Sequence, residues 1–144
     1  PVARTHAGRA PAGPKTSMLI VPTRLAPSRI HGIGVFADRP IRRGEPVWRF
    51  DERFYAVLTT EQIRAMPPDL AAFCRVYAWP HMKKPDLWCL DTDNGRFMNH
   101  ASDPNTDFRD PDTGWAIRDI AAGEELTCNY FEFDPAYRFE ADAA

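Results

Sequence analysis

The chain has 144 residues, of which 44% are apolar and 26% charged, and this is the length and composition of one globular domain. No apolar run approaches the roughly 18 residues of a membrane span. The net charge of -2 is unremarkable, but the chain after the basic N-terminal stretch is acidic, which is a mild argument against duplex DNA as a partner. The three cysteines stand far apart without CxxC spacing, which makes a disulfide framework or a cysteine-zinc site improbable.

Residues 1–17 are rich in Ala, Pro and Gly and carry basic side chains but no acid. They lack the apolar stretch of a secretory signal, so we expect a flexible N-terminal tail ahead of a domain that begins near Met18. The remaining chain is net acidic, which favours a basic substrate. Isolated cysteines and the missing signal predict a cytoplasmic, reducing location.

Short strands dominate the elements predicted after the tail. The first covers 18–27, the second follows two glycines one residue apart, and the third follows a turn at Arg43-Gly44. Later strands are predicted at 86–92, 114–120 and 124–131, with a short segment at 95–100. In the strands at 114–120 and 124–131, Trp115 and Ile117, and likewise Leu126 and Cys128, are expected to face the core, as the alternation of a half-buried strand requires.

Helical patterns occur only between residues 59 and 78. Thr59 or Thr60 is expected to cap the first helix, with Glu61 in its first turn. Pro67-Pro68 then separates this helix from a second one over 69–78. The sequence therefore predicts a small helical insert in a mainly β domain.

One pattern occurs twice in the chain. The stretches ADRPIRRGEPVWRF and AIRDIAAGEELTCNYF share Ile-x-x-Gly-Glu-x-apolar. The glycine allows a positive φ in a tight turn, and the glutamate begins the strand that follows. Two copies predict a β-rich domain with two related halves, and not an alternation of strands and helices. Glu124 and its neighbour Glu125 are expected to satisfy backbone amides in the second turn.

Three other site motifs are incomplete. The HGIG stretch at 31–34 has no third glycine and no following helix, so a dinucleotide fingerprint is not expected. The DTDNG stretch at 91–95 lacks the acidic twelfth residue of a calcium loop. The histidines lack HxxxH or HExxH spacing, which gives a zinc hydrolase no support.

Three stretches carry a specific resemblance: HGIGVFADRPIRRGE, GRFMNHASDPNT and IAAGEELTCNY, in this order. Together they resemble the SET domain of protein lysine methyltransferases, over residues 18–134. The resemblance implies a β-clip fold, mainly β, with short antiparallel sheets, a small helical insert and a C-terminal pseudoknot. Residues 135–144 would form an aromatic C-terminal tail or lid.

The chain departs from the family pattern in a few places. Ala101 replaces the serine of the NHS motif, and Asn129 replaces the aspartate before the final tyrosine. Many relatives carry zinc-binding cysteines near the position of Asp103 and after the domain, and this chain has none there. It therefore resembles the minimal, metal-free members found in bacteria and viruses, with aromatic residues of the tail closing the site.

The resemblance implies S-adenosylmethionine as the methyl donor and a lysine ε-amine as the acceptor. Tyr130 would be the catalytic residue, Asn99 would bind the methionine amino group, and His100 would meet the adenine through its backbone. The other cofactor-binding residues implied are Gly32, Ile33, Gly34, Val35, Arg96 and Phe97, with Arg96 and Phe97 on a packing strand. Tyr77, Trp79 and Phe133 are tentative walls of the substrate channel.

The expected partner is a basic protein or peptide that bears a lysine and lies as an extended strand between the insert and the tail. Neither a membrane nor a nucleic acid is expected as a partner. A second copy of the chain could complete the site, which makes a homodimer an open alternative. Two other functions stay open: a non-catalytic β-clip binding module, and a degenerate SET domain that binds S-adenosylmethionine without turnover. Only a methyltransferase needs both Tyr130 and Asn99.

Overall fold

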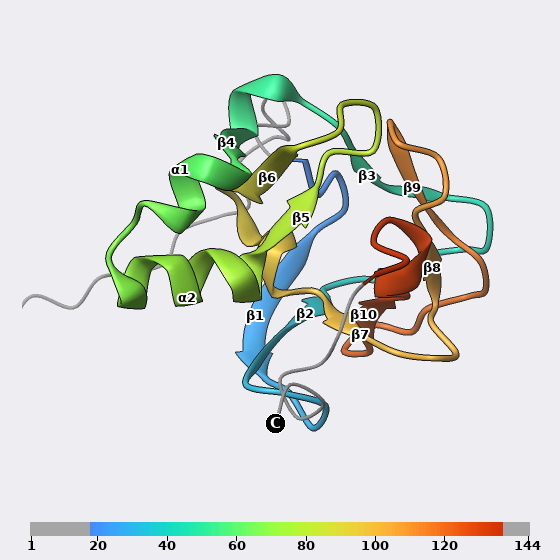
Figure 1. The fold of residues 1–144 in the computed structure, drawn as a ribbon. Helices are drawn as coiled ribbons and strands as arrows, with labels where there is room; N and C mark the ends of the chain where they lie inside the picture. The colour runs from blue at the N-terminus through green and yellow to red at the C-terminus, as the bar shows by residue number, and fades with distance from the viewer. Residues whose placement is uncertain (1–17, 137–144) are drawn as a thin grey trace, which may run out of the picture.

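The computed structural model describes residues 18–136, so the predicted N-terminal tail and most of the predicted C-terminal lid lie outside the described residues. Within this range short strands predominate, joined by two short α-helices and three single-turn 3-10 segments (Figure 1). The strands are β1 (Thr23–Pro27), β2 (Ile33–Ala37), β3 (Pro46–Arg49), β4 (Tyr55–Thr59), β5 (Ala78–Pro80), β6 (Leu87–Asp91), β7 (Asn99–His100), β8 (Thr106–Asp107), β9 (Thr113–Ala116) and β10 (Glu125–Cys128). The helices are α1 (Thr60–Arg64) and α2 (Pro68–Tyr77), and the 3-10 segments are η1 (Glu52–Phe54), η2 (Asn94–Phe97) and η3 (Tyr130–Glu132).

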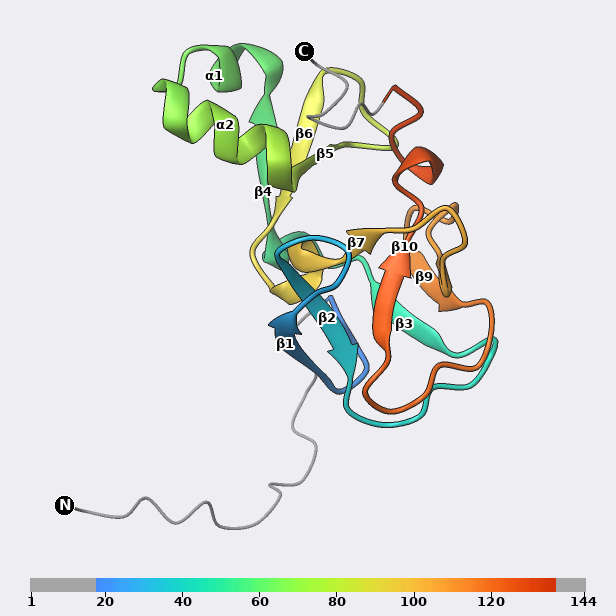
Figure 2. The same ribbon diagram turned by 90° about the horizontal axis from the view of Figure 1, so that it is seen from below.

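The strands form three small sheets with the orders β1-β2-β10-β7, β3-β9-β8 and β4-β6-β5. Every strand pair is antiparallel except β7 and β10, which run parallel. Figure 2 shows the β4-β6-β5 sheet and both helices at one end of the molecule, and the β3-β9-β8 sheet at the other. The prediction of a mainly β domain with a small helical insert is confirmed.

The first two sheets and the segment at 18–21 enclose the hydrophobic core. Its fully buried side chains include Met18, Val35, Ile41, Ile120 and Leu126. All three cysteines are free and buried, as the sequence predicts. Burial raises the pKa of the Cys89 thiol to about 12, so it behaves as a small apolar side chain.

The insert forms as its capping signals predict. Thr59, and not Thr60, is the N-cap of α1: its Oγ1 accepts from Gln62 N at 3.0 Å, and Gln62 Oε1 accepts from Thr59 N at 2.8 Å. This reciprocal capping box satisfies two amides that the first turn leaves without helical partners. Pro68 occupies the first turn of α2, where a missing N–H costs nothing.

The two Ile-x-x-Gly-Glu turns lie side by side. Ile41 and Ile120 form an isolated antiparallel bridge with N–H···O distances of 2.9 and 2.8 Å. Gly44 and Gly123 have φ values of 84° and 83°, the left-handed region that favours glycine. The repeated sequence therefore builds the same turn twice.

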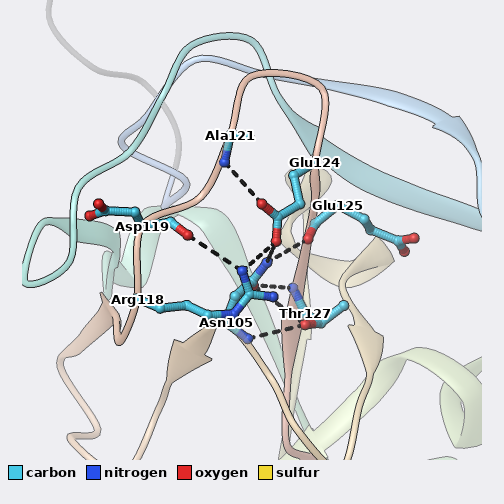
Figure 3. Close-up of polar contacts among 7 residues, drawn as sticks. All are labelled: Asn105, Arg118, Asp119, Ala121, Glu124, Glu125 and Thr127. Carbon is cyan, nitrogen blue, oxygen red and sulfur yellow. Dashed lines mark hydrogen bonds and ion pairs between the residues drawn. The ribbon is translucent and has the colours of Figure 1, made fainter.

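Both turns also contain a feature that the sequence prediction missed. In each copy the glutamate accepts from a backbone amide three residues earlier and pairs with an arginine six residues earlier. Glu45 binds Arg42 N and Arg39, and Glu124 binds Ala121 N at 2.9 Å and Arg118 at 2.6 Å (Figure 3). The repeated unit is thus Arg-x-Ile-x-x-Gly-Glu.

Two expectations about strands are wrong. The first strand begins only at Thr23, because Met18 N and Leu19 N donate to Asp93 Oδ2 at 2.7 and 3.2 Å instead of extending it. In β9, Trp115 points outward and is 38% exposed. Its neighbour Gly114 is buried because the Phe108 ring lies within 2.6 Å of where a Cβ would stand.

Ile117 is also exposed, and it follows the end of β9. The inward register of this strand therefore belongs to Gly114 and Ala116, which are both buried. By contrast, Leu126 and Cys128 on β10 are buried as predicted, together with Thr127 between them. This strand is covered on both faces.

Candidate active site

Three distant segments meet in the four-stranded sheet (Figure 2). Strand β2 begins at the HGIG loop, β7 consists of Asn99 and His100, and β10 leads directly to Tyr130. Strand β10 pairs with β2 on one side and with β7 on the other, so that Thr127 stands opposite Asn99. The residues that the sequence analysis takes from separate motifs therefore surround one strand.

Asn99 is the centre of the polar part of the site. It is 7% exposed, and its Nδ2 donates to His31 O at 3.1 Å, Ile33 O at 3.1 Å and Glu125 Oε1 at 2.8 Å. The other carboxylate oxygen of Glu125 accepts from Ser28 Oγ at 2.8 Å. We call Ser28, Gly34, Asn99 and Glu125 the Asn99 cluster. Its hydrogen bonds hold the HGIG loop against β7 and β10.

The two glycines of the loop are required for different physical reasons. At Gly34 a Cβ would lie 2.2 Å from Glu125 Oε1, so any side chain would displace the carboxylate from Asn99. At Gly32 a Cβ would meet nothing within 4 Å, and the φ of +46° is the constraint. Ile33 is 47% exposed, whereas Val35 is fully buried. The side chain of Val35 belongs to the core, and only its backbone lies beside the loop.

His100 contacts the strand that follows β10. Its Nδ1 accepts from Tyr130 N at 3.1 Å, and its ring centroid lies 5.3 Å from that of Tyr130. Burial lowers the pKa of His100, which favours the neutral ring that this hydrogen bond requires. The side chain thereby holds the position of Tyr130.

Arg96 and Phe97 do not form the predicted strand, because they end the 3-10 segment η2. Asp93 caps that segment by accepting from Gly95 N at 2.9 Å. The Arg96 guanidinium lies over the Phe97 ring, 4.6 Å from its centroid. The Phe97 ring in turn meets Tyr77 edge-on at 5.8 Å.

Tyr130 begins η3, and Asn129 caps that segment by accepting from Phe131 N at 3.0 Å. The Tyr130 hydroxyl donates to Met98 O at 2.7 Å. Met98 directly precedes Asn99, so this bond ties the hydroxyl to the strand that carries the Asn99 cluster. A hydroxyl whose proton is donated to a carbonyl presents its oxygen lone pairs in other directions.

Tyr130 lines a cavity of about 100 Å³ whose walls include several aromatic rings. The predicted channel residues Tyr77, Trp79 and Phe133 all line it as well. Phe133 meets the rings of Trp79 and Tyr130 at 6.4 and 5.8 Å. The structure thus brings the four predicted residues around one space. We call it the aromatic cavity, and its other lining side chains include Trp48, Arg96, Met98, Phe108, Cys128 and three aspartates.

Asp91, the last residue of β6, was not predicted as a site residue. It is 7% exposed, lines the aromatic cavity, and accepts from Trp79 Nε1 at 2.9 Å through Oδ1. Burial raises the pKa of Asp91 to about 7, although the Trp79 hydrogen bond acts in the opposite direction. The signal in the sequence that could have identified Asp91 is an acidic residue directly after the apolar run LWCL.

The expectation that Glu125 satisfies a backbone amide of the second turn is wrong. Its neighbour Glu124 does satisfy a turn amide, that of Ala121, as expected. Glu125 instead turns to Asn99 and Ser28, because consecutive residues of a strand point to opposite faces. Figure 3 shows the two carboxylates pointing in different directions.

Two other kinds of feature are absent from the described residues. Between Met18 and Ala136, no group of three or more His, Cys, Asp or Glu side chains is placed to hold a metal ion. In the same part of the chain no helix is long and apolar enough to cross a membrane. The predicted lid residues Tyr137 and Phe139 lie outside the described residues.

Comparison with known proteins agrees with this arrangement. The SET domain family profile matches residues 32–131 of the chain. No curated protein sequence matches it. The chain therefore belongs to the SET domain family, and the resemblance inferred from its motifs is confirmed.

Solved structures show the same fold. DIM-5, a histone lysine methyltransferase of Neurospora, is 27% identical with a TM-score of 0.55, over 77% of this chain and 52% of that one. A humanized mutant of Polycomb Repressive Complex 2 from Chaetomium thermophilum, bound to an inhibitor, is 25% identical with a TM-score of 0.55, over 79% and 15%. The apo complex from that organism in an autoinhibited state reaches 0.59 at 25% identity, over 81% and 16%. The chain thus spans only part of these larger proteins.

Proposed function

We propose that this SET domain transfers a methyl group from S-adenosylmethionine to the ε-amine of a lysine in a protein substrate. The observation that carries the proposal is the hydrogen bond from Tyr130 to Met98 O at 2.7 Å. It joins the aromatic cavity to the Asn99 cluster, so that a donor and an acceptor bound at these two places would meet beside one hydroxyl.

The residues of the Asn99 cluster fit the amino-acid end of the cofactor. Three oxygen atoms, from His31, Ile33 and Glu125, converge on Asn99 Nδ2, which has only two hydrogens to donate. The surplus acceptor capacity suits the cofactor's ammonium group, and the open space at Gly32 leaves room beside the loop. When bound, the cofactor supplies a methyl group on a positively charged sulfur.

The aromatic cavity fits the acceptor. Apolar walls disfavour an ammonium ion and lower its pKa, which promotes the neutral amine that the reaction needs. The ring faces of Tyr77, Trp79 and Phe133 still attract the positive charge of a lysine that enters or leaves. Tyr130 would orient the amine and the methyl group through its hydroxyl oxygen. Asp110 and Asp134 line the same cavity and favour a basic peptide.

DIM-5 acts on histone lysine, and by analogy we propose a basic protein or peptide as the partner of this chain. We expect the substrate to lie extended along a sheet edge between the insert and the tail. Cytoplasmic location, absence of a resident metal, a homodimer and the domain limits 18–134 stay predictions. The assignment to a bacterial host has no support from the relatives found.

The test incubates the full chain with S-adenosylmethionine labelled in its methyl group and a mixture of basic proteins, with core histones among them. We expect label on lysine side chains, identified by mass spectrometry, and cofactor binding measurable by calorimetry. The Tyr130→Phe variant should bind the cofactor and lose transfer.

Cofactor binding without transfer to any lysine would contradict the methyltransferase and favour a degenerate domain. Failure to bind the cofactor would leave a peptide-binding module as the better description. Equal transfer by the wild type and Tyr130→Phe would remove the role assigned to Tyr130.

A further inference from the structure

The aromatic cavity contains a carboxyl group that the fold alone does not require. Asp91 is 7% exposed, and Trp79 Nε1 fixes the orientation of its carboxyl group through a 2.9 Å hydrogen bond to Oδ1. Within residues 18–136 nothing donates a hydrogen bond to Oδ2, although every fully buried polar side-chain atom there has a partner. Oδ2 is therefore reached from the cavity that Asp91 lines.

The surroundings keep this corner of the cavity open. A Cβ at Gly95 would lie 3.1 Å from Asp91 Oδ2 and 3.6 Å from Trp48 Nε1. Glycine thus leaves the carboxyl oxygen accessible beside an indole N–H. A carboxyl group that is largely withdrawn from water and has no protein donor for one oxygen is costly, so its retention in this cavity points to a ligand that supplies the donor.

The charged and titratable neighbours do not neutralise Asp91. Asp93, which caps η2, raises the pKa of Asp91, and Arg96 on η2 lowers it, both with a smaller effect than burial. Arg96 itself hydrogen-bonds to Thr92 O and Asp93 O. Cys89 on the same strand and Cys128 on β10 are held as neutral thiols, because burial raises the pKa of both.

We propose that Asp91 Oδ2 captures the substrate lysine as an ammonium ion in the aromatic cavity and accepts one of its protons before methyl transfer. This inference rests on the proposed function. The step is balanced: the N–H bond of the ammonium breaks, an O–H bond forms on Asp91, and the amine keeps the electron pair. That pair then forms the N–CH₃ bond while the S–CH₃ bond of the cofactor breaks, leaving a neutral thioether.

Burial makes the proton transfer feasible because it shifts the two groups toward each other. The free lysine amine has a pKa near 10.4, and a dry aromatic environment lowers it. The same environment raises the pKa of Asp91 to about 7. A purely structural carboxylate, present only to orient Trp79, would have no need of this match.

The first test compares pH profiles of kcat/KM for the wild type and Asp91→Asn, an isosteric change that keeps an oxygen for Trp79. We expect the variant to be slower by about 100-fold at pH 7. It should recover at least about tenfold by pH 9.5, where more of the lysine is already neutral in solution. Asp86→Asn is the matched control, since Asp86 is exposed and outside the cavity. Parallel profiles for Asp91→Asn and the wild type would overturn the inference.

The second test needs no activity and uses n-butylammonium as a probe of the lysine head group. In the wild type we expect the Asp91 carboxyl carbon to titrate near neutral pH by NMR and to shift when the probe is added. The probe should bind Asp91→Asn at least about tenfold more weakly. Equal binding by the variant, or an Asp91 signal that ignores the probe, would overturn the inference even in an active enzyme. A wild type that binds the probe through Asp91 but transfers no methyl group would overturn the proposed function instead.

Discussion

The Asn99 cluster and the aromatic cavity adjoin each other but satisfy their polar groups in opposite ways. In the cluster, Glu125 binds both Asn99 and Ser28, and Gly34 packs directly against the same carboxylate. In the cavity, Asp91 has one oxygen bound to Trp79 and one that faces the open space. One region is closed by its own hydrogen bonds, and the other leaves an acceptor for a ligand.

This difference indicates where the fold is less stable than it could be because a functional group is kept there. A satisfied polar network makes a region rigid and specific, which suits a loop that, under the proposed function, presents its backbone to the cofactor. A buried carboxyl group without a second donor destabilises the protein and is retained where a ligand supplies that donor. The closed hydrogen bonding of the Asn99 cluster therefore suits the positioning of a ligand, and the open acceptor of the aromatic cavity suits the binding of one.

The largest expected effect tests the cost of leaving Asp91 open. The pKa of Asp91 is raised to about 7 in the folded protein, against about 3.9 in the unfolded chain. Its protonated form thus contributes stability that is full below pH 3.9 and is lost as the pH rises through 7. Asp91→Asn cannot ionise. Its unfolding free energy relative to that of the wild type should therefore rise by on the order of 3 kcal/mol as the pH goes from 5 to 8.

Urea unfolding of both proteins at several pH values measures this difference. Asp86→Asn, the same change at an exposed position, should follow the wild type at every pH. A constant difference between Asp91→Asn and the wild type would mean that Asp91 does not titrate in this range, and would remove the contrast between the two regions.

The second prediction concerns the Asn99 cluster and compares the same glycine-to-alanine substitution at two positions of its loop. Gly34→Ala puts a methyl group 2.2 Å from Glu125 Oε1 and separates that carboxylate from Asn99. We expect a loss of about 2–3 kcal/mol in unfolding free energy and no cofactor binding. Gly32→Ala has open space but a positive φ, so it should cost only about 1 kcal/mol. Denaturation and calorimetry measure both, and equal losses would mean that packing on Glu125 is not the constraint.

The third prediction concerns the contribution of Trp79 to the pKa of Asp91 in the cavity. Trp79→Phe keeps an aromatic wall but removes the hydrogen bond to Asp91 Oδ1. Because that bond lowers the pKa of Asp91, its loss should raise the midpoint of the Asp91 titration by about one pH unit. NMR of the carboxyl carbon measures the midpoint. An unchanged midpoint would show that burial alone sets it, and that Trp79 only fills space.

Much of the fold could be predicted from local signals. The Thr59 capping box, the Pro68 helix start and the two glycine turns are encoded within a few residues, and each occurs where the sequence indicates. The family motifs likewise identified three segments that the structure brings together. These features depend on short-range chemistry or on a specific order of residues.

Features set by distant packing could not be predicted in this way. Trp115 points outward because Phe108 requires glycine at the neighbouring inward position, which no alternation pattern reveals. Asp91 and Glu125 look like ordinary acids at the ends of strands in the sequence. Only the crossing of β2, β7 and β10 and the position of Trp79 show which groups they meet.

The smallest expected effect asks whether the tight hydrogen bonding of the Asn99 region extends to the turn that leads into β10. Glu124 binds Ala121 N, Arg118 and Asn105, whose side chain also binds Glu125 O at 2.7 Å and Thr127 N at 2.8 Å (Figure 3). Glu45 in the first turn binds Arg42 N and Arg39. The second turn is thus linked to the site strand.

Glu124→Gln should therefore lose about 1 kcal/mol in unfolding free energy. Burial opposes ionisation of Glu124, but its hydrogen bonds with Ala121 N, Arg118 and Asn105 together lower its pKa below the usual value. Its contribution is thus present above the unfolded pKa and is lost as the pH falls through the folded pKa. The deficit of Glu124→Gln should therefore shrink as the pH falls below the unfolded glutamate value of about 4.3. Urea unfolding at pH 7 and pH 3.5 measures this change. An equal deficit at both pH values would mean that the charge of Glu124 does not stabilise the turn, and that the tight hydrogen bonding ends at β10.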